Sequence, residues 1–553
     1  MNYKTSVLSA ILCAGICALS AAQEASVEAK IDAVFERWNR PDSAGAVVGV
    51  VKDGALVFAK GYGMENVAAG KHLGPASRMN LGSTSKQFAA ASIVLLAQEG
   101  KLSLDDDIRK WLPEMPDYGN VITIRHLIHH TSGLRDYLAL HALAGLSDES
   151  SFGNQEVLDI VARQKELNFN PGEEFLYSNT GYVLLAIIVK RASGMTLTQF
   201  AQQRIFDPLG MAQTCVDTDL SIHTDTRALS YATRGANIPP ANRLDVVEGD
   251  GNIMSTVGDL AKWDANFYEP KVGGQALIDQ MLIPGVLNNG EKIDYAFGLV
   301  HDTVLGRPTL DHGGSWLGFR AQFTRFPQDH LSVIVLCNMA TMNPDALVEE
   351  VAKIYLGESA STESGKSESS SDGAKPKKRD LKAKTGRYFV ENTGTLVIVD
   401  LEDDALRVEV DTASVFLAAI DARRFRPATP TSFAEVEFDT EGSAEPSSIT
   451  VKSASGRTQT ARRVSEDVPS PKPEELAGTY YSPEIDVEYT IAVKGGAAEI
   501  TRPNAKPATL EPIHADWFRA SFRYHFERDS AGKITGFRAS LGRVKNILFE
   551  KRK

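Results

Sequence analysis

Cysteine is scarce in this sequence: there are four cysteines in 553 residues, and Cys13 and Cys17 lie in an apolar run at the N-terminus. The other two, Cys215 and Cys337, are too few for a disulfide framework. Cys337 stands in the strand-like run LSVIVLCNMA, which favours a buried free thiol, although the sequence leaves open whether the two pair. A disulfide-stapled fold is thereby excluded, and we expect the chain to depend on buried apolar surface.

Positive charge is also in the minority. The chain has 59 Lys and Arg against 71 Asp and Glu, which gives a net charge of −12. Binding to nucleic-acid phosphates draws on clustered Lys and Arg, and no such cluster is evident. The composition therefore argues against nucleic-acid and anionic-membrane partners, and we expect a small molecule or peptide as the substrate. The oligomeric state is left open.

The apolar run at the N-terminus is too short to span a membrane. Lys4 is followed by apolar residues from Val7 to Leu19 and by small residues at positions 20–22, the layout of a secretory signal peptide. A spanning helix needs about 20 apolar residues, so an uncleaved anchor is the weaker interpretation. We expect residues 1–22 to be removed, with no transmembrane segment left, and the mature protein to be periplasmic or secreted.

The first large domain is expected over residues 23–357. The dipeptide Asp53-Gly54 between two apolar runs predicts a tight β-hairpin. Residues 31–38 and 343–357 have helical spacing, and strands are expected over 284–300, 310–327 and 330–340. Helical segments lie between these two sets of strands. The pattern predicts an α+β fold, in which helices pack against one antiparallel sheet.

Two β-rich modules follow a Ser-, Lys- and Glu-rich stretch, residues 358–380, that has the composition of a flexible linker. The first, module 1, covers residues 381–465, and the second, module 2, covers residues 471–553. TGRYFV and FRPAT in module 1 correspond in order and spacing to AGTYYS and FRASF in module 2. We expect a diverged repeat of two small all-β barrels or sandwiches, with Tyr480, Trp517 and Phe518 as core aromatics.

Ser83 and Lys86 stand at the start of an otherwise apolar segment that runs to Gly100. Residues i and i+3 share a helix face, so the lysine amine could accept the serine proton. Burial lowers the pKa of lysine side chains in general, which makes a neutral amine plausible. Taken alone, an N-capping serine beside a solvated lysine is the simpler interpretation.

Two later segments favour a catalytic role for Ser83 and Lys86 over the simpler interpretation. Tyr177 and Asn179 are two residues apart before a second apolar helix, so both could enter one cleft, the tyrosine to relay a proton and the asparagine to bind a carbonyl. His312 is followed by Gly313 and Gly314, which leave the backbone of a strand open to a substrate. The N–H groups of Ser315 and Ser83 could then form an oxyanion hole.

Ser-x-x-Lys, Tyr-x-Asn and a basic residue with glycines on a late strand, in this order, resemble the penicillin-recognising serine hydrolases. These include class C β-lactamases, D-alanyl-D-alanine carboxypeptidases, D-aminopeptidases and esterases. The resemblance extends from about residue 28 to 357 and includes ITIRHLIHHTSGL, IFDPLGM and GNIMSTVGDLAKW. It implies that Ser83 is the acylated nucleophile, that Lys86 and Tyr177 transfer its proton, that Asn179 contacts substrate, and that His312, Gly313, Gly314 and Ser315 dock it. The residues leave open whether Lys86 or Tyr177 is the base.

One departure separates this chain from most β-lactamases and carboxypeptidases of that group, which carry Lys-Thr-Gly where His312-Gly313-Gly314 stands. A histidine is mostly neutral at pH 7, so it would hold a substrate carboxylate less firmly. The sequence resembles the D-aminopeptidase and esterase branch, and β-lactamase activity ranks below a peptidase or esterase. The modules resemble accessory barrels of some D-aminopeptidases.

Alternatives from other classes are a non-catalytic binding protein with the same fold and a protein whose main function lies in the two modules. His126, His129 and His130 in RHLIHHTSG could suggest a metal, but no H-E-x-x-H acid and no third ligand accompany them. We expect no metal and no other cofactor.

Overall fold

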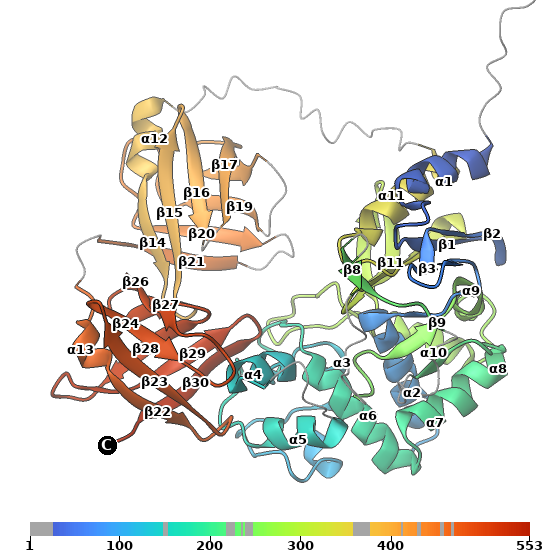
Figure 1. The fold of residues 1–553 in the computed structure, drawn as a ribbon, viewed down its shortest axis with the longest axis horizontal. Coiled ribbons are helices and arrows are strands. Elements are labelled where there is room, and N and C mark those ends of the chain that lie inside the picture. Colours follow the sequence, from blue (N-terminus) through green and yellow to red (C-terminus); the bar gives the residue numbers. More distant parts are fainter. Residues whose placement is uncertain are drawn as a thin grey trace, which may run out of the picture.

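The computed structural model describes residues 26–146, 153–216, 227–233, 236–237, 247–357, 377–410, 413–428, 433–453, 458–465 and 469–553, and Figure 1 shows its three parts. The helices are α1 (Val27–Phe35), α2 (Lys86–Gln98), α3 (Ile124–Ile128), α4 (Tyr137–Ala144), α5 (Asn154–Ala162), α6 (Asn179–Ser193), α7 (Leu197–Ala201), α8 (Asp207–Leu209), α9 (Val257–Ala265), α10 (Gly274–Met281), α11 (Pro344–Leu356), α12 (Lys378–Lys384) and α13 (Pro473–Leu476). Shorter turns are η1 (Glu36–Trp38), η2 (Gly82–Ser85), η3 (Ile108–Lys110), the π-helical η4 (Gln202–Phe206) and η5 (Pro327–Asp329).

A six-stranded antiparallel sheet, ordered β10-β11-β12-β13-β1-β2, forms the centre of the N-terminal domain. Its strands are β1 (Ala46–Lys52), β2 (Ala55–Tyr62), β10 (Val300–Val304), β11 (Arg307–Trp316), β12 (Phe319–Phe326) and β13 (Leu331–Cys337). The expected hairpin joins β1 to β2, with Asp53 at φ 51° and Gly54 at φ 79°. The Asp-Gly dipeptide accepts these positive φ values, so the predicted hairpin is confirmed. The antiparallel sheet with helices packed against it confirms the predicted α+β fold.

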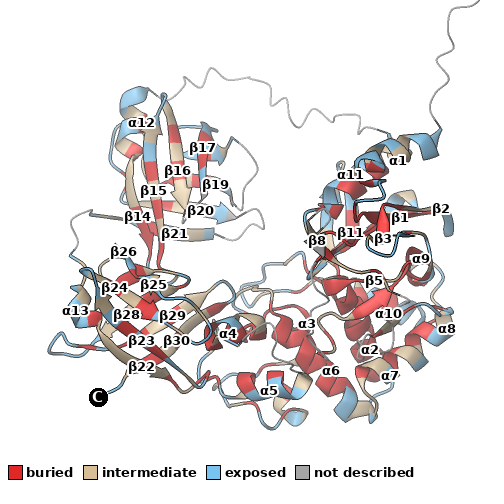
Figure 2. Cartoon of the chain, viewed as in Figure 1, coloured by how far each residue is buried: buried red, intermediate tan, exposed pale blue. Residues whose placement is uncertain are grey.

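Alternate residues of β1 enter two cores on opposite faces of the sheet. Val48 and Val50 pack with the residues of α1 and α11, whereas Val47 and Val51 face the larger core built by the other helices. That larger core contains α2 and α6, and Figure 2 shows both helices coloured as buried. Their apolar faces lie against each other, and their first residues, Lys86 and Asn179, are joined by a hydrogen bond of 2.9 Å.

Short strands complete the domain: β5 (Met79–Asn80), β9 (Ile253–Ser255) and β6 (Cys215–Val216) form one sheet, and β3 (Met64–Asn66) with β4 (Lys71–His72) and β7 (Tyr231–Thr233) with β8 (Ala236–Asn237) form two ribbons. Cys215 is half-buried and Cys337 is buried on β13, and neither forms a disulfide within the described residues. The burial predicted for Cys337 is therefore confirmed.

The strand expected over residues 284–300 is wrong. The structure has turns there, with isolated bridges of Val286 to Lys292 and of Tyr295 to Val300, before β10 begins. The turn at Gly290, which has φ +86°, folds the segment onto itself, and Leu287 N–H donates to Glu291 O at 2.8 Å. The backbone is thus paired locally rather than in the central sheet.

Module 1 is a closed antiparallel barrel with eight strands: β14 (Gly386–Val390), β15 (Thr395–Glu402), β16 (Ala405–Val410), β17 (Ala413–Ala419), β18 (Arg424–Pro427), β19 (Phe433–Phe438), β20 (Ser448–Ser453) and β21 (Thr458–Val464). Module 2 is a nine-stranded sheet ordered β25-β24-β23-β22-β30-β29-β28-β27-β26. Its strands are β22 (Gly478–Ser482), β23 (Val487–Lys494), β24 (Ala497–Thr501), β25 (Ala508–Thr509), β26 (Glu511–His514), β27 (Trp517–Arg519), β28 (Arg523–Arg528), β29 (Ile534–Leu541) and β30 (Val544–Lys551).

The two modules begin in the same way. In each, a short helix precedes the first strand, and a buried tyrosine bonds to a carbonyl four residues earlier: Tyr388 Oη donates to Lys384 O at 2.9 Å, and Tyr480 Oη donates to Leu476 O at 2.6 Å. This shared local geometry supports the diverged repeat. Phe518 is buried in one core with Tyr480, as expected. Trp517 is also buried, but it packs against module 1, with its ring centroid 5.8 Å from that of Phe389.

The signal peptide predicted at residues 1–22 lies outside the described residues, as do residues 358–376 of the predicted linker. The linker was expected to reach residue 380, but α12 begins at Lys378, because Leu381 and Lys384 are buried with module 1. Within the described residues, no single helix has the length and apolarity to cross a membrane. One pair, Asn179–Ser193 with Leu197–Leu209, meets those criteria only jointly and is bent by 73°.

Candidate active site

Ser83 lies in the 3₁₀ turn η2, directly before α2. Its side chain is half-buried, whereas its neighbours Gly82 and Thr84 are buried. Lys86 is the first residue of α2, and its Nζ lies 3.1 Å from Ser83 Oγ. We expected Ser83 and Lys86 to share one turn of an α-helix. The turn is a 3₁₀ turn instead, and because the side chains of residues i and i+3 are aligned in a 3₁₀ turn, the contact still forms.

Lys86 is completely buried and is held by oxygen atoms from two distant segments. Its Nζ donates to Asn179 Oδ1 at 2.9 Å and to the main-chain carbonyl of Asp250 at 2.8 Å. The Asp250 carboxyl accepts from Tyr137 Oη at 3.0 Å. Burial raises the pKa of Asp250, and the nearby charge of Lys86 opposes that shift. The amine is therefore fixed on Ser83 by Asn179 and Asp250.

Tyr177 lies on the loop before α6, and the centre of its ring is 4.9 Å from Lys86 Nζ. The ring of buried His130 packs against it at a centroid distance of 4.1 Å. The Tyr177 hydroxyl is buried and has no hydrogen-bond partner among the described residues. Buried polar groups are normally paired, so an unpaired phenol beside a serine and a lysine is available to a reacting group.

Strand β11 passes directly over the η2 turn. Thr84 Oγ1 donates to His312 O at 3.0 Å. A Cβ on Gly314 would lie 1.9 Å from Leu81 O, and a Cβ on Gly82, which has φ +50°, would lie 2.5 Å from Ser315 N. Only glycine permits this approach. The main-chain nitrogen of Ser315 is thus brought beside the turn that carries Ser83, the arrangement expected for an oxyanion hole.

His312 is buried, and both of its ring nitrogens are engaged. Nε2 lies 3.0 Å from Tyr295 Oη and Nδ1 lies 2.6 Å from Gly313 O. A carbonyl can only accept, so these partners assign the proton to Nδ1 and leave Nε2 to accept from Tyr295. Burial, reinforced by the charge of Lys86, lowers the pKa of His312 to about 4. The side chain is therefore neutral at pH 7, as the sequence predicted.

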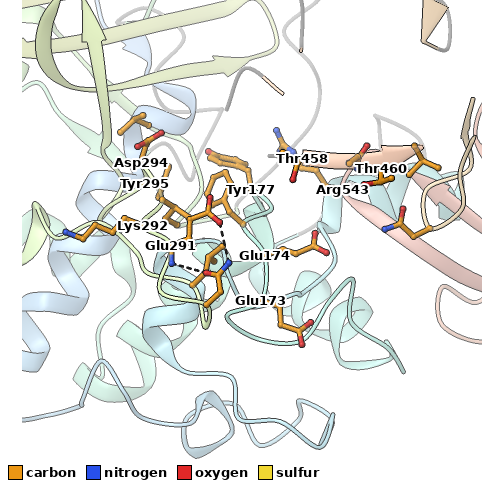
Figure 3. Close-up of a pocket in the computed structure, with 18 of the residues that line it drawn as sticks. Glu173, Glu174, Tyr177, Glu291, Lys292, Asp294, Tyr295, Thr458, Thr460 and Arg543 are labelled. Carbon is orange, nitrogen blue, oxygen red and sulfur yellow. Dashed lines mark hydrogen bonds between the residues drawn. The ribbon is translucent and has the colours of Figure 1, made fainter. Parts of the chain in front are cut away.

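A cavity of about 1630 Å³ opens beside these residues and is lined by all three parts of the chain. Tyr177, His312 and Gly313 contribute from the N-terminal domain, Phe389 from module 1 and Arg543 from module 2. Figure 3 shows Tyr177 and Arg543 among its walls. Ser83 and Lys86 are not part of the lining, so the cavity adjoins the nucleophile turn on the side of Tyr177 and His312.

The three histidines considered for a metal each bond to the backbone instead. Nδ1 of His126 accepts from Thr123 N–H, and Nδ1 of His130 accepts from Ser178 N–H. Nδ1 of His129 lies 3.1 Å from Tyr295 O. Burial lowers the pKa values of all three histidines, that of His129 to about 4. These contacts give them structural roles around the cleft.

Sequence reasoning missed Asp250, Tyr295 and Arg543. Asp250 bonds to Lys86 through its main-chain carbonyl, which every residue has. Its side chain therefore could not identify it in the sequence as a site residue, and only its position just before GNIMST could have done so. Tyr295 stood in a segment that was predicted to be a strand. Arg543 is 366 residues from Tyr177, on a hairpin of module 2, and only the packing of the modules brings it to the site.

Comparison with known proteins agrees with this geometry. Residues 31–356 match the model of the Beta-lactamase family. Penicillin-binding protein 4* of Bacillus subtilis (strain 168) is 32% identical over 345 residues, which are 59% of this chain and 75% of that protein. D-aminopeptidase of Brucella anthropi is 26% identical over 458 residues, 82% of each chain.

The fold is also found among solved structures. The octameric penicillin-binding protein homologue from Pyrococcus abyssi aligns with a TM-score of 0.55 at 23% identity, over 79% of this chain and 99% of that one. The family match covers more than half of the chain and includes the Ser83, Tyr177 and His312 segments. This protein is thus a serine hydrolase and belongs to the beta-lactamase family.

Proposed function

We propose that this protein is an exported hydrolase that cleaves an amide or ester bond in small substrates, including peptides of D-amino acids, through an acyl-enzyme on Ser83. The observation that carries the proposal is the 3.1 Å contact between Ser83 Oγ and a buried Lys86 Nζ. An exposed lysine would be hydrated, whereas this one is held on the serine by Asn179 and Asp250.

The first half-reaction is acylation. Ser83 Oγ attacks the carbonyl carbon of the substrate as its proton leaves, and Lys86 and Tyr177 are the two groups placed to receive that proton. The N–H groups of Ser83 and Ser315 would bind the oxyanion that develops on the carbonyl oxygen. The bond to the leaving nitrogen or oxygen then breaks, and the leaving group takes the proton.

Deacylation uses the same groups, with water as the nucleophile and Ser83 Oγ as the leaving group. Water attacks the acyl carbon, gives its proton to the Lys86–Tyr177 pair and displaces Ser83 Oγ, which recovers a proton. Asn179 would hold the substrate through its amide N–H group, because its Oδ1 is occupied by Lys86. Tyr177 contributes a hydroxyl without a competing partner among the described residues.

The choice of substrate class rests on two points. The D-aminopeptidase relative aligns over 82% of this chain, which extends the similarity beyond the N-terminal domain. His312 is neutral at pH 7, so it cannot supply the positive charge that a lysine would give a penicillin carboxylate. We therefore place peptidase or esterase activity ahead of β-lactamase activity. Export is inferred from residues 1–22 of the sequence.

Mass spectrometry of the intact protein tests the nucleophile. The wild-type chain, after incubation with a fluorophosphonate, an activated ester or a β-lactam, should gain the mass of one adduct, and Ser83→Ala should gain none. Ser315→Ala is the matched control: it removes a hydroxyl next to the site but keeps the backbone N–H, so it should still be labelled.

The relative labelling rates of the ester and the β-lactam rank the two activities. Labelling of folded Ser83→Ala at the wild-type rate would refute the assignment of the nucleophile. If the folded wild-type protein takes up none of the three reagents, the non-catalytic binding protein becomes the better explanation.

A further inference from the structure

Module 2 places one arginine against the catalytic tyrosine. Arg543 lies in the turn between β29 and β30, and its guanidinium carbon is 4.6 Å from the centre of the Tyr177 ring. Lys86 Nζ is 4.9 Å from the same centre. Burial lowers the pKa of the His130 ring, and both charges add to that shift. Arg543 therefore belongs to the electrostatic environment of the active site, although it comes from another domain.

The turn that carries Arg543 is fixed to the N-terminal domain by its backbone. Arg543 O accepts from Asn168 Nδ2 at 2.9 Å and from Asp136 N–H at 3.4 Å. Asn168 Oδ1 in turn accepts from Lys545 N–H at 2.8 Å. The buried guanidinium of Arg135 donates to Lys545 O at 3.0 Å and to Asn546 O at 3.2 Å. The position of the Arg543 side chain is thus set by the interface.

The guanidinium of Arg543 keeps its hydrogen-bonding capacity. Its Nη1 forms an ion pair with the buried Asp136 Oδ2 at 3.8 Å, which is beyond hydrogen-bond distance, and that oxygen already accepts from Asn179 N–H at 2.8 Å. Among the described residues it donates no hydrogen bond, and its side chain, 45% exposed, is part of the cavity wall. A planar guanidinium with free donors is suited to a carboxylate, which it can bind through two parallel hydrogen bonds.

Among the described residues at this end of the cavity, no other group offers a positive charge with unused hydrogen-bond donors, although Asp136 offsets part of the charge of Arg543. His312 is neutral, and Lys86 is committed to Ser83, Asn179 and Asp250. Glu174 is 3.5 Å from Lys545, which offsets its charge. The rest of the wall carries more acids than bases: Glu173, Glu291, Asp294, Asp302 and Glu391 against Lys292, Arg462 and Arg463. An anionic group would therefore be favoured beside Arg543 and disfavoured elsewhere.

We propose that Arg543 is a specificity-determining residue that binds a carboxylate of the substrate near the scissile bond. The inference rests on the proposed hydrolase function and narrows it to carboxylate-bearing peptides and esters. An ammonium group next to the scissile carbonyl is repelled by the same guanidinium. Module 2 is then part of the substrate-binding site. The expected substrates carry a carboxylate near the scissile bond, unlike the substrates of an enzyme that selects a free amino terminus.

The test compares two N-acyl-D-alanyl thioesters, one with a thioglycolate leaving group and the other with its methyl ester. Hydrogen bonds to a charged group contribute about 1.5–3 kcal/mol, a factor of about 10 to 150. In the full-length protein, Arg543→Gln should lower kcat/KM for the thioglycolate substrate by about 10- to 100-fold and change that for the methyl ester less than 3-fold. Arg543→Lys should give an intermediate loss.

Arg519→Gln is the matched control, because it removes one positive charge from module 2 at a residue that does not line the cavity. It should affect neither substrate. Equal losses for both substrates in Arg543→Gln would assign Arg543 a structural role, and no loss would refute carboxylate binding; either result overturns the proposal.

A second measurement does not depend on turnover. N-acetyl-D-alanylglycine, whose carboxylate stands where that of the thioglycolate substrate does, should protect wild-type Ser83 from fluorophosphonate better than N-acetyl-D-alanylglycinamide does, and Arg543→Gln should abolish the difference. Equal protection by the acid and the amide in the wild-type protein overturns the carboxylate proposal while Ser83 labelling still supports the hydrolase. Failure of Ser83 to be labelled at all would instead refute the proposed function.

Discussion

The buried ion pair between Arg135 and Glu484 is predicted to control the docking of module 2. Arg135 is 0% and Glu484 3% exposed, and Arg135 Nη1 lies 2.5 Å from Glu484 Oε2. Gln164 Oε1 accepts from the same nitrogen at 3.0 Å. Figure 1 shows module 2 against α4 and α5, next to the site of these contacts. The perturbation that we consider is Arg135→Met, which fills similar space without the charge.

The loss of interface free energy in this variant can be estimated from the groups that remain in the interface. Arg135→Met leaves the Glu484 carboxylate buried, with only the N–H groups of Lys165, at 3.0 Å, and Leu548, at 3.4 Å, as donors. The Lys545 carbonyl loses its Arg135 donor as well, whereas the Asn546 carbonyl keeps the bond from Arg538 Nη1 at 3.2 Å. Breaking a buried pair by removing one partner costs about 3–5 kcal/mol, because an uncompensated charge is left behind.

Hydrogen exchange at the interface measures this cost directly. The backbone N–H groups of Asp136 and Lys545 bond across the interface, to Arg543 O and Asn168 Oδ1, so they exchange when module 2 separates. A loss of about 3–5 kcal/mol should speed their exchange by about two to four powers of ten. The same variant should lose the discrimination between the two thioesters, because Arg543 is carried by the displaced turn.

Two further variants test whether the buried ion pair itself holds module 2 in place. Arg135→Met with Glu484→Leu removes both charges and should recover most of the protection. Glu114→Gln breaks the exposed pair with Arg191, at 2.7 Å, and should leave exchange at the interface unchanged. Wild-type exchange rates in folded Arg135→Met would show that the pair does not hold the modules together.

The remaining predictions concern the active site and its pH dependence. Unfolding by urea should require less denaturant as the pH falls from 7 to 5, because folded His129 and His312, with pKa values of about 4, take up their protons later than the unfolded chain does. The linkage is about 2 kcal/mol per histidine at pH 5, whereas burial raises the pKa of Asp311 to about 7, so that group opposes the loss by about 2 kcal/mol between pH 7 and 5. The loss should therefore be steeper in Asp311→Asn, and a flat profile in that variant would contradict the linkage. Gly314→Ala should abolish labelling of the nucleophile, because its Cβ would collide with Leu81 O and push β11 away, whereas Gly74→Ala, which meets nothing within 4 Å, should be labelled normally. Tyr295→Phe should lower the free energy of unfolding by about 1–3 kcal/mol, since it leaves His312 Nε2 buried without a donor; unchanged stability would argue against that hydrogen bond.

The hairpin at Asp53-Gly54, the helix at residues 343–357 and the later strands were predictable from sequence, because turn chemistry and apolar periodicity act over a few residues. Residues 284–300 were misassigned, because an apolar run there folds onto itself around Gly290. The Ser83–Lys86 contact was also predictable, because one turn of chain is enough to bring the two side chains together.

The rest of the site depends on contacts between residues far apart in the chain. Asp250 O reaches Lys86 across 164 residues, and Tyr295 reaches His312 from a loop that has no regular pattern. Arg543 meets Tyr177 only because module 2 docks on the N-terminal domain, where Asn168 and Asp136 bond to the backbone of its turn. Local sequence thus determined which groups could react, while tertiary packing decided which charges surround them, since desolvation and Coulomb interactions depend on distance in space and not on distance along the chain.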